Sequence, residues 1–183
     1  MTPEQLLEIM PAAKDRAGTY CKWLNIAMSA YDIDTPARQA AFLAQVAHES
    51  GSLRYTAEIA SGKAYEGRSD LGNTQPGDGV KFKGHGLLQI TGRSNHAACS
   101  QGLFGNEKVL VSSPDALSSP LLACLSAAWF WNSKGLNALA DAGDFTRITR
   151  RINGGLNGLD QRREFWERAK AVFGQSSDDQ KIA

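Results

Sequence analysis

Apolar residues recur at helical spacing along most of this chain. Between positions 12 and 30 they fall at steps of three and four residues, which is the period of one face of an amphipathic helix. The same spacing resumes after Thr35-Pro36, where Thr35 can cap a helix and Pro36 suits its first position because proline lacks an N–H. We expect this second helix to run to about Glu49 and to stop near Gly51.

Similar periodic stretches occur elsewhere, several of them opened by a capping residue or closed by glycine. We expect helices over residues 4–10, 93–101, 119–131, 145–152 and 160–173, with Asp144 as a cap and Gly174 as a stop. Between residues 61 and 92 the pattern breaks, and glycine recurs every few positions. That segment predicts a long functional loop holding at most a small hairpin, with Val80–Phe82 paired against Leu87–Ile90. The fold class that follows is mainly α (α+β), with a small β element in the middle.

Length and composition fit a single catalytic domain over residues 1–183. Hydrophobic residues make up 42% of the chain and charged residues 21%, as in ordinary globular proteins, and only the polar segment 175–183 is expected to form a flexible tail. The three cysteines are far apart and form no C-x-x-C, so neither a disulfide framework nor a zinc site is expected. We expect a monomer that requires no metal and no cofactor.

The charge distribution bears on the partner. A formal net charge of +1 argues against a protein that coats nucleic acid. Basic residues nevertheless gather late in the chain, where they form either a face that meets an anionic polymer or cell envelope, or an ordinary solvated helix face. These residues are Arg147, Arg150, Arg151, Arg162, Arg163, Arg168 and Lys170. The tryptophans Trp129, Trp131 and Trp166 have helical core spacing and are interpreted as core.

The N-terminus lacks the basic start and long apolar run of a signal peptide. No stretch approaches the roughly 20 apolar residues that a membrane-spanning helix needs. We therefore expect synthesis in the cytoplasm. A target outside the membrane would then be reached only through release by another protein.

Glu49 is the strongest candidate for chemistry. It follows Val46 and Ala47 at the edge of the apolar helix face, close to the helix end. Partial desolvation and the negative end of the helix dipole both disfavour an ionised carboxyl, which suits a general acid. Glycoside hydrolysis also needs a second acid. Glu58 and Glu66 both follow beyond the glycine break, and the residues alone leave the choice between them open.

Two further segments carry polar groups in useful arrangements. If Gln89 and Thr91 lie on a strand, their side chains share one face, where an amide and a hydroxyl can hold one water. An inverting glycosidase uses such a water as its nucleophile. Asn153, followed by two glycines, either stops a helix or projects an amide toward the N-acetyl group of a sugar.

Taken in order, these motifs resemble glycoside hydrolase family 19, and more closely its bacterial and phage branch, whose members are often endolysins. The resemblance covers about residues 38–172, and its segments are weak singly but specific in this order. They are His48–Gly51, Glu58, Leu71–Gly79, Gly84–Asn95 and Asn153–Gly155. The resemblance implies a lysozyme-like, mainly helical fold with a deep groove, and an inverting mechanism on β-1,4-linked N-acetylated sugars.

The resemblance also implies catalytic roles for single residues. Glu49 matches the general acid of the family, and Glu58 best matches its general base. Thr91 and Gln89 match the positions that hold the attacking water.

Around the substrate, three positions match the family and two depart from it. Asn95 and Asn153 match sugar-contacting residues, and His48 matches the residue that helps to orient the acid. His85 stands where the family usually has arginine, so a group that titrates near neutral pH would replace a fixed charge. His96 stands where tyrosine is common, which would weaken stacking on a sugar ring.

The leading functional prediction is a peptidoglycan hydrolase that cleaves between N-acetylmuramic acid and N-acetylglucosamine. The missing signal peptide, the compact length and the basic C-terminal segment favour it, and we expect such an enzyme to act in the periplasm or cell wall after release by a phage holin. The alternative is a chitinase, with the same chemistry on an uncharged polymer. A non-catalytic sugar-binding module is the alternative of another class, and the presence of Glu49, Glu58 and Thr91 argues against it.

Overall fold

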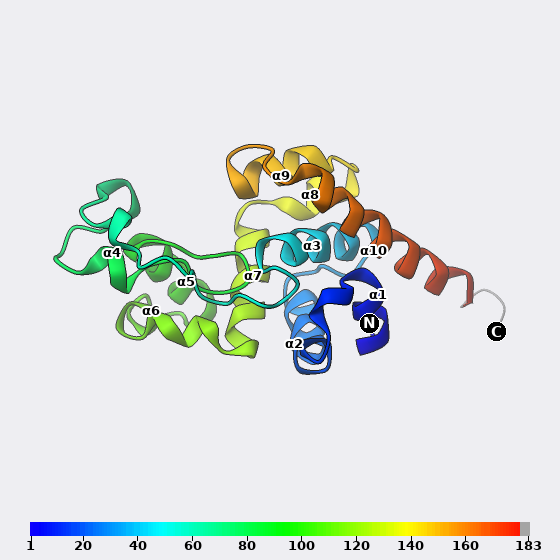
Figure 1. Cartoon of the computed structure of the whole chain (residues 1–183), viewed down its shortest axis with the longest axis horizontal. Coiled ribbons are helices and arrows are strands. Elements are labelled where there is room, and N and C mark those ends of the chain that lie inside the picture. The colour runs from blue at the N-terminus through cyan, green and yellow to red at the C-terminus, as the bar shows by residue number, and fades with distance from the viewer. Residues whose placement is uncertain (180–183) are drawn as a thin grey trace.

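The computed structural model describes residues 1–179, which form ten α-helices and four short 3₁₀ turns (Figure 1). The helices are α1 (Pro3–Ile9), α2 (Arg16–Ala30), α3 (Pro36–Glu49), α4 (Asp78–Lys81), α5 (Arg93–Phe104), α6 (Lys108–Ser112), α7 (Pro120–Ser133), α8 (Leu136–Asp141), α9 (Phe145–Asn153) and α10 (Leu159–Asp179). The 3₁₀ turns lie at Pro11–Ala13, Lys63–Tyr65, Ser69–Leu71 and Pro114–Ser118. One lobe holds α4, α5 and α6, the other holds α1, α2, α3, α8, α9 and α10, and α7 runs between them.

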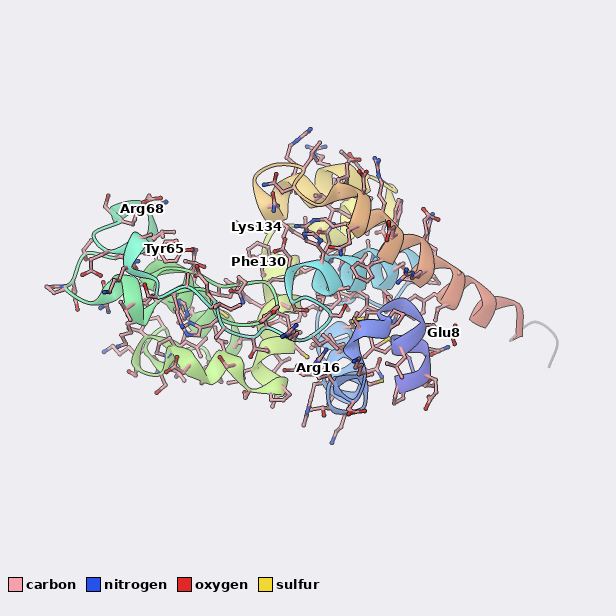
Figure 2. The ribbon with its side chains drawn as sticks, viewed as in Figure 1. Glu8, Arg16, Tyr65, Arg68, Phe130 and Lys134 are labelled. Atoms are coloured by element: carbon pink, nitrogen blue, oxygen red, sulfur yellow. The ribbon has the colours of Figure 1, made fainter. Side chains whose placement is uncertain are left out.

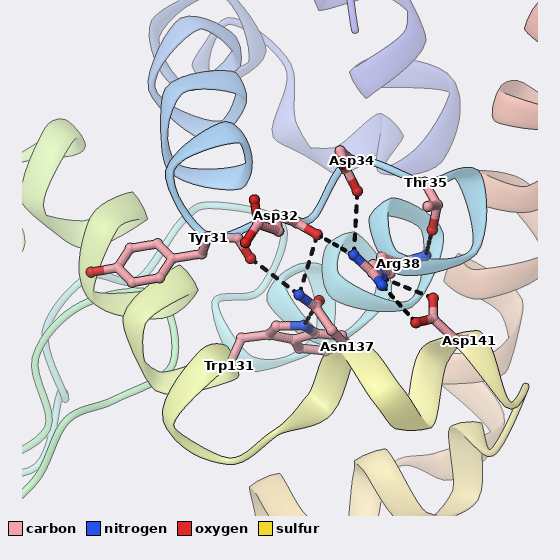
Figure 3. A network of polar contacts seen from close by, with 8 residues as sticks. All are labelled: Tyr31, Asp32, Asp34, Thr35, Arg38, Trp131, Asn137 and Asp141. Atoms are coloured by element: carbon pink, nitrogen blue, oxygen red, sulfur yellow. Dashed lines mark hydrogen bonds and ion pairs between the residues drawn. The ribbon is translucent and has the colours of Figure 1, made fainter.

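The N-terminus of α3 is fixed by its cap and by a polar network (Figure 3). The Thr35 side chain accepts a hydrogen bond from the Arg38 N–H at 3.3 Å, so the predicted cap is confirmed. The Arg38 guanidinium binds the Asp141 carboxylate of α8 through Nε at 2.8 Å and Nη2 at 2.7 Å. Asn137 of α8 accepts from the Trp131 indole of α7 and donates to carbonyls of the loop before α3. One polar network therefore connects α3, α7 and α8.

From Ala40 to Ala47, α3 is buried on every side. α10 packs along it, and Trp131 of α7 meets Phe42 edge to face with ring centroids 5.5 Å apart. The predicted apolar face is confirmed. The burial is wider than that face, so the polar side chain of Gln45 is enclosed as well.

Apolar side chains form two clusters, one in each lobe. The larger cluster joins α1, α2, α3, α7, α8, α9 and α10. The smaller one contains Ile90, Cys99, Leu110 and Leu117, with the partly buried Trp129 and Phe130 of α7 packed against it. α7 thus contributes to both clusters and holds the lobes together. Within residues 1–179, no helix combines the length and the apolar composition required to cross a membrane.

The prediction of a hairpin between Val80–Phe82 and Leu87–Ile90 is wrong. Val80 lies in α4, which begins after a left-handed glycine. Pairing in this part of the described chain is limited to isolated bridges from His85 to Ala57 and to Ile90. Gln89 adopts a φ of 51°, which breaks an extended strand at that point. The fold is therefore mainly α, without the expected β-hairpin among the described residues.

The later helices follow their predictions with one exception. Asp144 caps α9 by accepting from the Arg147 N–H at 3.0 Å. α10 does not stop at Gly174 but continues to Asp179, because one glycine inside a long helix costs only about 1 kcal/mol. Of the flexible tail expected at 175–183, residues 175–179 are helical, and residues 180–183 lie outside the described residues.

Candidate active site

Glu49 is the last residue of α3 and forms an ion pair with Arg162 of α10. Arg162 Nη2 donates to Glu49 Oε1 at 2.6 Å. The arginine side chain is fully buried, whereas the glutamate keeps 21% of its side-chain surface exposed. One oxygen of the predicted acid is thus held by a buried cation, while part of the carboxyl group stays open to solvent. Besides burial and the helix end, this cation therefore acts on the Glu49 carboxyl group.

Arg162 organises this half of the site. Its Nη1 donates to Gln45 Oε1 of α3, and its Nε donates to the Asn157 carbonyl at 3.1 Å. Gln45 Nε2 in turn donates to Thr149 Oγ1 of α9 at 2.9 Å. A buried charge needs such a complete set of partners. The expectation that Arg162 belongs to a basic surface face is wrong, because its partners lie inside the larger lobe.

His48 packs between the acid and the start of α10. Its Nδ1 lies 2.7 Å from Gln161 Oε1, and this amide oxygen can only accept, so Nδ1 carries the proton. A Cβ added at Gly158, which has a φ of 69°, would lie 2.1 Å from the His48 ring. Burial lowers the pKa of His48, and the positive charge of Arg162 lowers it further. The ring is therefore neutral at pH 7 and is held between an amide and a glycine.

Glu58 lies in the loop after α3, and both of its carboxyl oxygens accept hydrogen bonds. The Tyr65 hydroxyl donates to Oε1 at 3.0 Å and the Gly84 N–H donates to Oε2 at 3.1 Å. Burial raises the pKa of Tyr65, with a further contribution from Glu58, so the hydroxyl stays protonated and able to donate. A Cβ on Gly84 would lie 2.5 Å from Gln89 Oε1. Gly84 therefore allows Glu58 and Gln89 to approach from its two sides.

Glu66, the competing candidate for the base, has a different environment. Its Oε1 accepts from the Gly77 N–H and its Oε2 from the Gly79 N–H, both at 2.7 Å. These bonds fasten the start of α4 to the loop before it. Glu66 thus has a structural role at the start of α4. Glu58 also accepts a backbone N–H, from Gly84, so the choice of Glu58 as the second acid stays a prediction.

The segment between the two acids is pinned at both ends. The Ser50 carbonyl accepts the N–H groups of Arg54 and Tyr55, each at 2.9 Å, and the Thr56 carbonyl accepts the Gly86 N–H at 2.8 Å. The short path from the acid to the candidate base is therefore fixed by backbone hydrogen bonds.

A pocket of about 180 Å³ lies between the loop and α7. Three predicted site residues line it, namely Gln89, Thr91 and Asn95. The α7 side contributes Trp129, Phe130, Ser133 and Lys134. Figure 2 shows Phe130 and Lys134 together where the lobes meet. The expectation that Trp129 is core is therefore wrong in part: it packs on the smaller cluster, but it also forms the wall of this pocket.

Gln89 and Thr91 do not share a strand face, yet the pocket unites them. Gln89 Nε2 donates to the Gly86 carbonyl at 2.8 Å, and the Thr91 hydroxyl donates to the Gln89 carbonyl at 3.0 Å. Asn95 Nδ2 donates to the Thr91 carbonyl at 2.7 Å. Because the Thr91 proton is engaged, its oxygen keeps lone pairs with which it can accept a hydrogen bond from a water.

Asn153 is the last residue of α9, and Gly154 follows it in the left-handed conformation. The helix stop is therefore confirmed. The Asn153 Oδ1 atom is also buried, without a hydrogen-bond partner among the described residues. An unpaired buried acceptor costs roughly 1–3 kcal/mol, but this oxygen is closed to solvent and Asn153 does not line the pocket, so a ligand N–H reaches it only after the side chain turns outward.

His85 and His96 are fully buried, which overturns the expectation that His96 lies where it could meet a sugar ring. His85 Nδ1 lies 3.2 Å from His96 Nε2, and His85 Nε2 lies 3.0 Å from Asp115 Oδ1. Burial lowers the pKa of both rings, that of His96 to about 4. For His85 the nearby Asp115 carboxylate opposes this lowering of the pKa, and fully buried His96 has no surface with which to stack on a sugar. Both rings instead hold the glycine-rich loop against α5.

The remaining nucleophilic groups are inert. Cys21, Cys99 and Cys124 are buried and free, and burial raises the pKa of Cys99 to about 12. Within residues 1–179, no group of three or more His, Cys, Asp or Glu side chains is placed to hold a metal ion. The site offers carboxyl, amide and hydroxyl groups, which are suited to acid–base hydrolysis.

Sequence reasoning missed Arg162, Tyr65 and Lys134 as site residues. Gln45 carries a usable signal for Arg162, because a polar residue between Ala44 and Val46 on a buried helix needs a polar partner. No comparable signal exists for Lys134, whose place at the pocket depends on how α7 meets the loop.

Comparison with known proteins gives relatives of one kind. No family model matches the chain. A glycosyl hydrolase family 19 domain-containing protein of Haemophilus influenzae is 33% identical over 156 residues, which cover 68% of this chain and 74% of that protein. An Arabidopsis thaliana endochitinase is 42% identical over 117 residues, or 63% of this chain and 39% of the endochitinase. The chain thus spans about two fifths of that plant relative.

Solved structures share the fold. Chitinase C of Streptomyces griseus superposes with a TM-score of 0.74 at 26% identity, covering 94% of this chain and 76% of the chitinase. A bacterial family 19 chitinase superposes with a TM-score of 0.76 over 94% of both chains, at 24% identity. The similarity to the Haemophilus protein spans most of that relative, and the candidate acid, base and pocket fall within one fold of this kind. The chain belongs to glycoside hydrolase family 19.

Proposed function

We propose that this protein hydrolyses β-1,4 bonds in polymers of N-acetylglucosamine with inversion at the anomeric carbon. The observation that carries the proposal is the division of the site into two acids in different environments. Glu49 is partly open to solvent and forms an ion pair with buried Arg162. Glu58 accepts a hydrogen bond from the Gly84 N–H, and the loop that contains Gly84 continues to Gln89 and Thr91, which line the pocket. Two carboxyls with separate surroundings are what this hydrolysis needs.

In the proposed mechanism, protonated Glu49 donates its proton to the glycosidic oxygen. As the bond breaks, the carboxylate that forms is stabilised by Arg162, which already binds one of its oxygens. Ionised Glu58 removes a proton from a water that Thr91 and Gln89 hold in the pocket. That water attacks the anomeric carbon from the opposite face. An inverting pair works with carboxyl groups roughly 6.5–9.5 Å apart.

Around these groups, His48 and Asn153 are proposed to position the acid and the substrate. Neutral His48 keeps the end of α3 in register with α10. Asn153, whose Oδ1 is unpaired and buried, turns toward the substrate to accept the N–H of an N-acetyl group, and Asn95 in the pocket binds a sugar hydroxyl.

Chitin oligomers are the substrate that the relatives favour. The Arabidopsis thaliana relative and a Zea mays relative are both endochitinases, and the solved neighbours are chitinases. Peptidoglycan, with phage-type release to the cell wall, is the second candidate. It is favoured by Lys134, a cation in the pocket for which an uncharged chitin chain offers no partner. The exposed arginines of α9 and α10 would then face the anionic envelope.

The test is product analysis by mass spectrometry and NMR on chitin hexamer and on purified peptidoglycan, with Glu49→Gln as the control. New reducing ends of α configuration from a β-linked substrate, absent with the control, are the expected result. Products of β configuration would contradict inversion. If neither polymer yields products, the protein would be a non-catalytic sugar-binding module.

A further inference from the structure

The pocket between the loop and α7 has an uneven electrostatic character. Among its lining residues, Lys134 is the one with a charged side chain, and no carboxylate lines the pocket. Within the described residues, Lys134 takes part in no ion pair. Its ammonium group therefore raises the potential of the pocket without an internal counter-ion.

The backbone around Lys134 is fixed. Its N–H donates to the Phe130 carbonyl at 3.1 Å as α7 ends, and its carbonyl accepts from Arg151 Nη1 at 2.8 Å. The ammonium lies 5.5 Å from the centre of the Phe130 ring, which is within cation–π distance. Lys134 is thus an exposed residue of the pocket lining, and its ammonium lies beside the Phe130 ring, which lines the same pocket.

The rest of the pocket suits a sugar ring. Leu71, Ile90 and the α7 aromatics supply apolar surface for a ring face, and Thr91 and Asn95 supply hydrogen-bonding groups. Thr91 is also a proposed holder of the attacking water. Lys134 therefore faces a sugar bound next to the bond that is cleaved.

We infer that Lys134 is a specificity-determining residue that recognises a carboxylate on the sugar bound in this pocket. The inference rests on the proposed function and narrows its substrate. N-acetylglucosamine carries no carboxylate, whereas N-acetylmuramic acid carries a lactyl group that is free in peptide-stripped strands and linked to an acidic peptide in intact peptidoglycan. A charge-assisted hydrogen bond to either carboxylate would favour these strands over chitin.

The test compares kcat/KM for the wild type, Lys134→Met and Lys134→Arg on three substrates: chitin hexamer, peptide-stripped glycan strands and intact peptidoglycan fragments. Lys134→Met is expected to lower the ratio of kcat/KM on a carboxylate-bearing strand to that on chitin by roughly tenfold, mainly through KM. Lys134→Arg, which keeps the positive charge, is expected to retain most of the wild-type ratio. Lys108→Met, which removes an exposed lysine at the start of α6, is the matched control and should leave the ratio unchanged.

The outcomes separate the inference from the proposed function. A loss on stripped strands identifies the lactyl carboxylate as the recognised group, and a loss on intact fragments alone identifies the peptide. Equal losses on all three substrates, or a wild type active on chitin alone, would overturn the inference and leave the hydrolase standing. A wild type that cleaves none of the three would overturn the hydrolase itself.

Discussion

The acid side and the base side of the site are built by different means. On the acid side, Glu49 and Arg162 come from α3 and α10, and their contacts run mainly between side chains of packed helices. On the base side, Glu58 and Thr91 lie in a loop, and their contacts run largely to backbone N–H and carbonyl groups. The acid side thus depends on a buried charge and its partners, and the base side on the backbone conformation of a glycine-rich segment.

The difference predicts how each half fails. On the acid side, removing one member of the ion pair lowers stability, because the other charged side chain stays buried without a counter-ion. A loop held by backbone bonds fails when its conformation shifts, because several side chains then move together. Variants on each side should therefore differ in what they lose.

Glu49→Gln is expected to lower kcat by roughly 10⁴-fold, because the amide cannot deliver the proton and general acid catalysis is worth up to that much. The melting temperature should fall modestly, since Arg162 loses its anion. Steady-state kinetics on chitin hexamer and thermal denaturation measure the two effects. Glu164→Gln, on the exposed face of α10, is the matched control with activity near wild type. Retained activity in Glu49→Gln would remove the acid assignment.

Glu58→Gln is expected to lower kcat by roughly 10³-fold, because the neutral amide cannot take the proton of the water. Glu66→Gln should change kcat only a few-fold but destabilise the protein by about 1–2 kcal/mol, since one of its two backbone donors loses an acceptor. Kinetics and urea denaturation of both variants provide the measurement. The opposite order of activities would make Glu66 the base.

His96 makes the base side sensitive to acid. Its folded pKa is about 4 and its ordinary value is 6.5, so the unfolded chain binds a proton first as pH falls. The free energy of unfolding should be unaffected by this group above pH 6.5 and should drop by about 3 kcal/mol between pH 6.5 and 4. His96→Gln, which stays neutral, should flatten that part of the profile measured by urea denaturation. An unchanged slope would mean that the ring does not resist protonation.

Gly158→Ala tests whether close packing also matters on the acid side. The new Cβ would meet the His48 ring at 2.1 Å, and the φ of 69° disfavours any side chain. We expect a loss of about 2 kcal/mol in stability and a lower kcat as the ring is displaced. Gly143→Ala has the same φ but open space around the Cβ, so it should show the backbone cost alone, about 1 kcal/mol, with full activity. Equal effects in both variants would dismiss the ring contact.

Local rules predicted the helical half well and the loop half poorly. α3 and α9 begin directly after their predicted caps, Thr35 and Asp144, because a cap acts within the first turn of its helix. The hairpin failed because Val80 lies in α4 and the Gly84 N–H binds the Glu58 carboxylate, 26 positions earlier in the chain. The strand propensity of a short segment carries no information about a hydrogen-bond partner that lies elsewhere in the chain.

Sequence alone predicts the helix that ends in Glu49, the glycine-rich segment after it, and the order of motifs that marks the family. The helix and its end depend on periodicity and capping, which act over a few residues. The burial of Arg162 against Glu49, the closure of His85 and His96 to solvent and the place of Lys134 in the pocket lining emerge only when the helices pack. The physical reason is that the fate of a charged or polar side chain depends on its surroundings. For Arg162 those surroundings arrive from a helix 113 positions earlier in the chain.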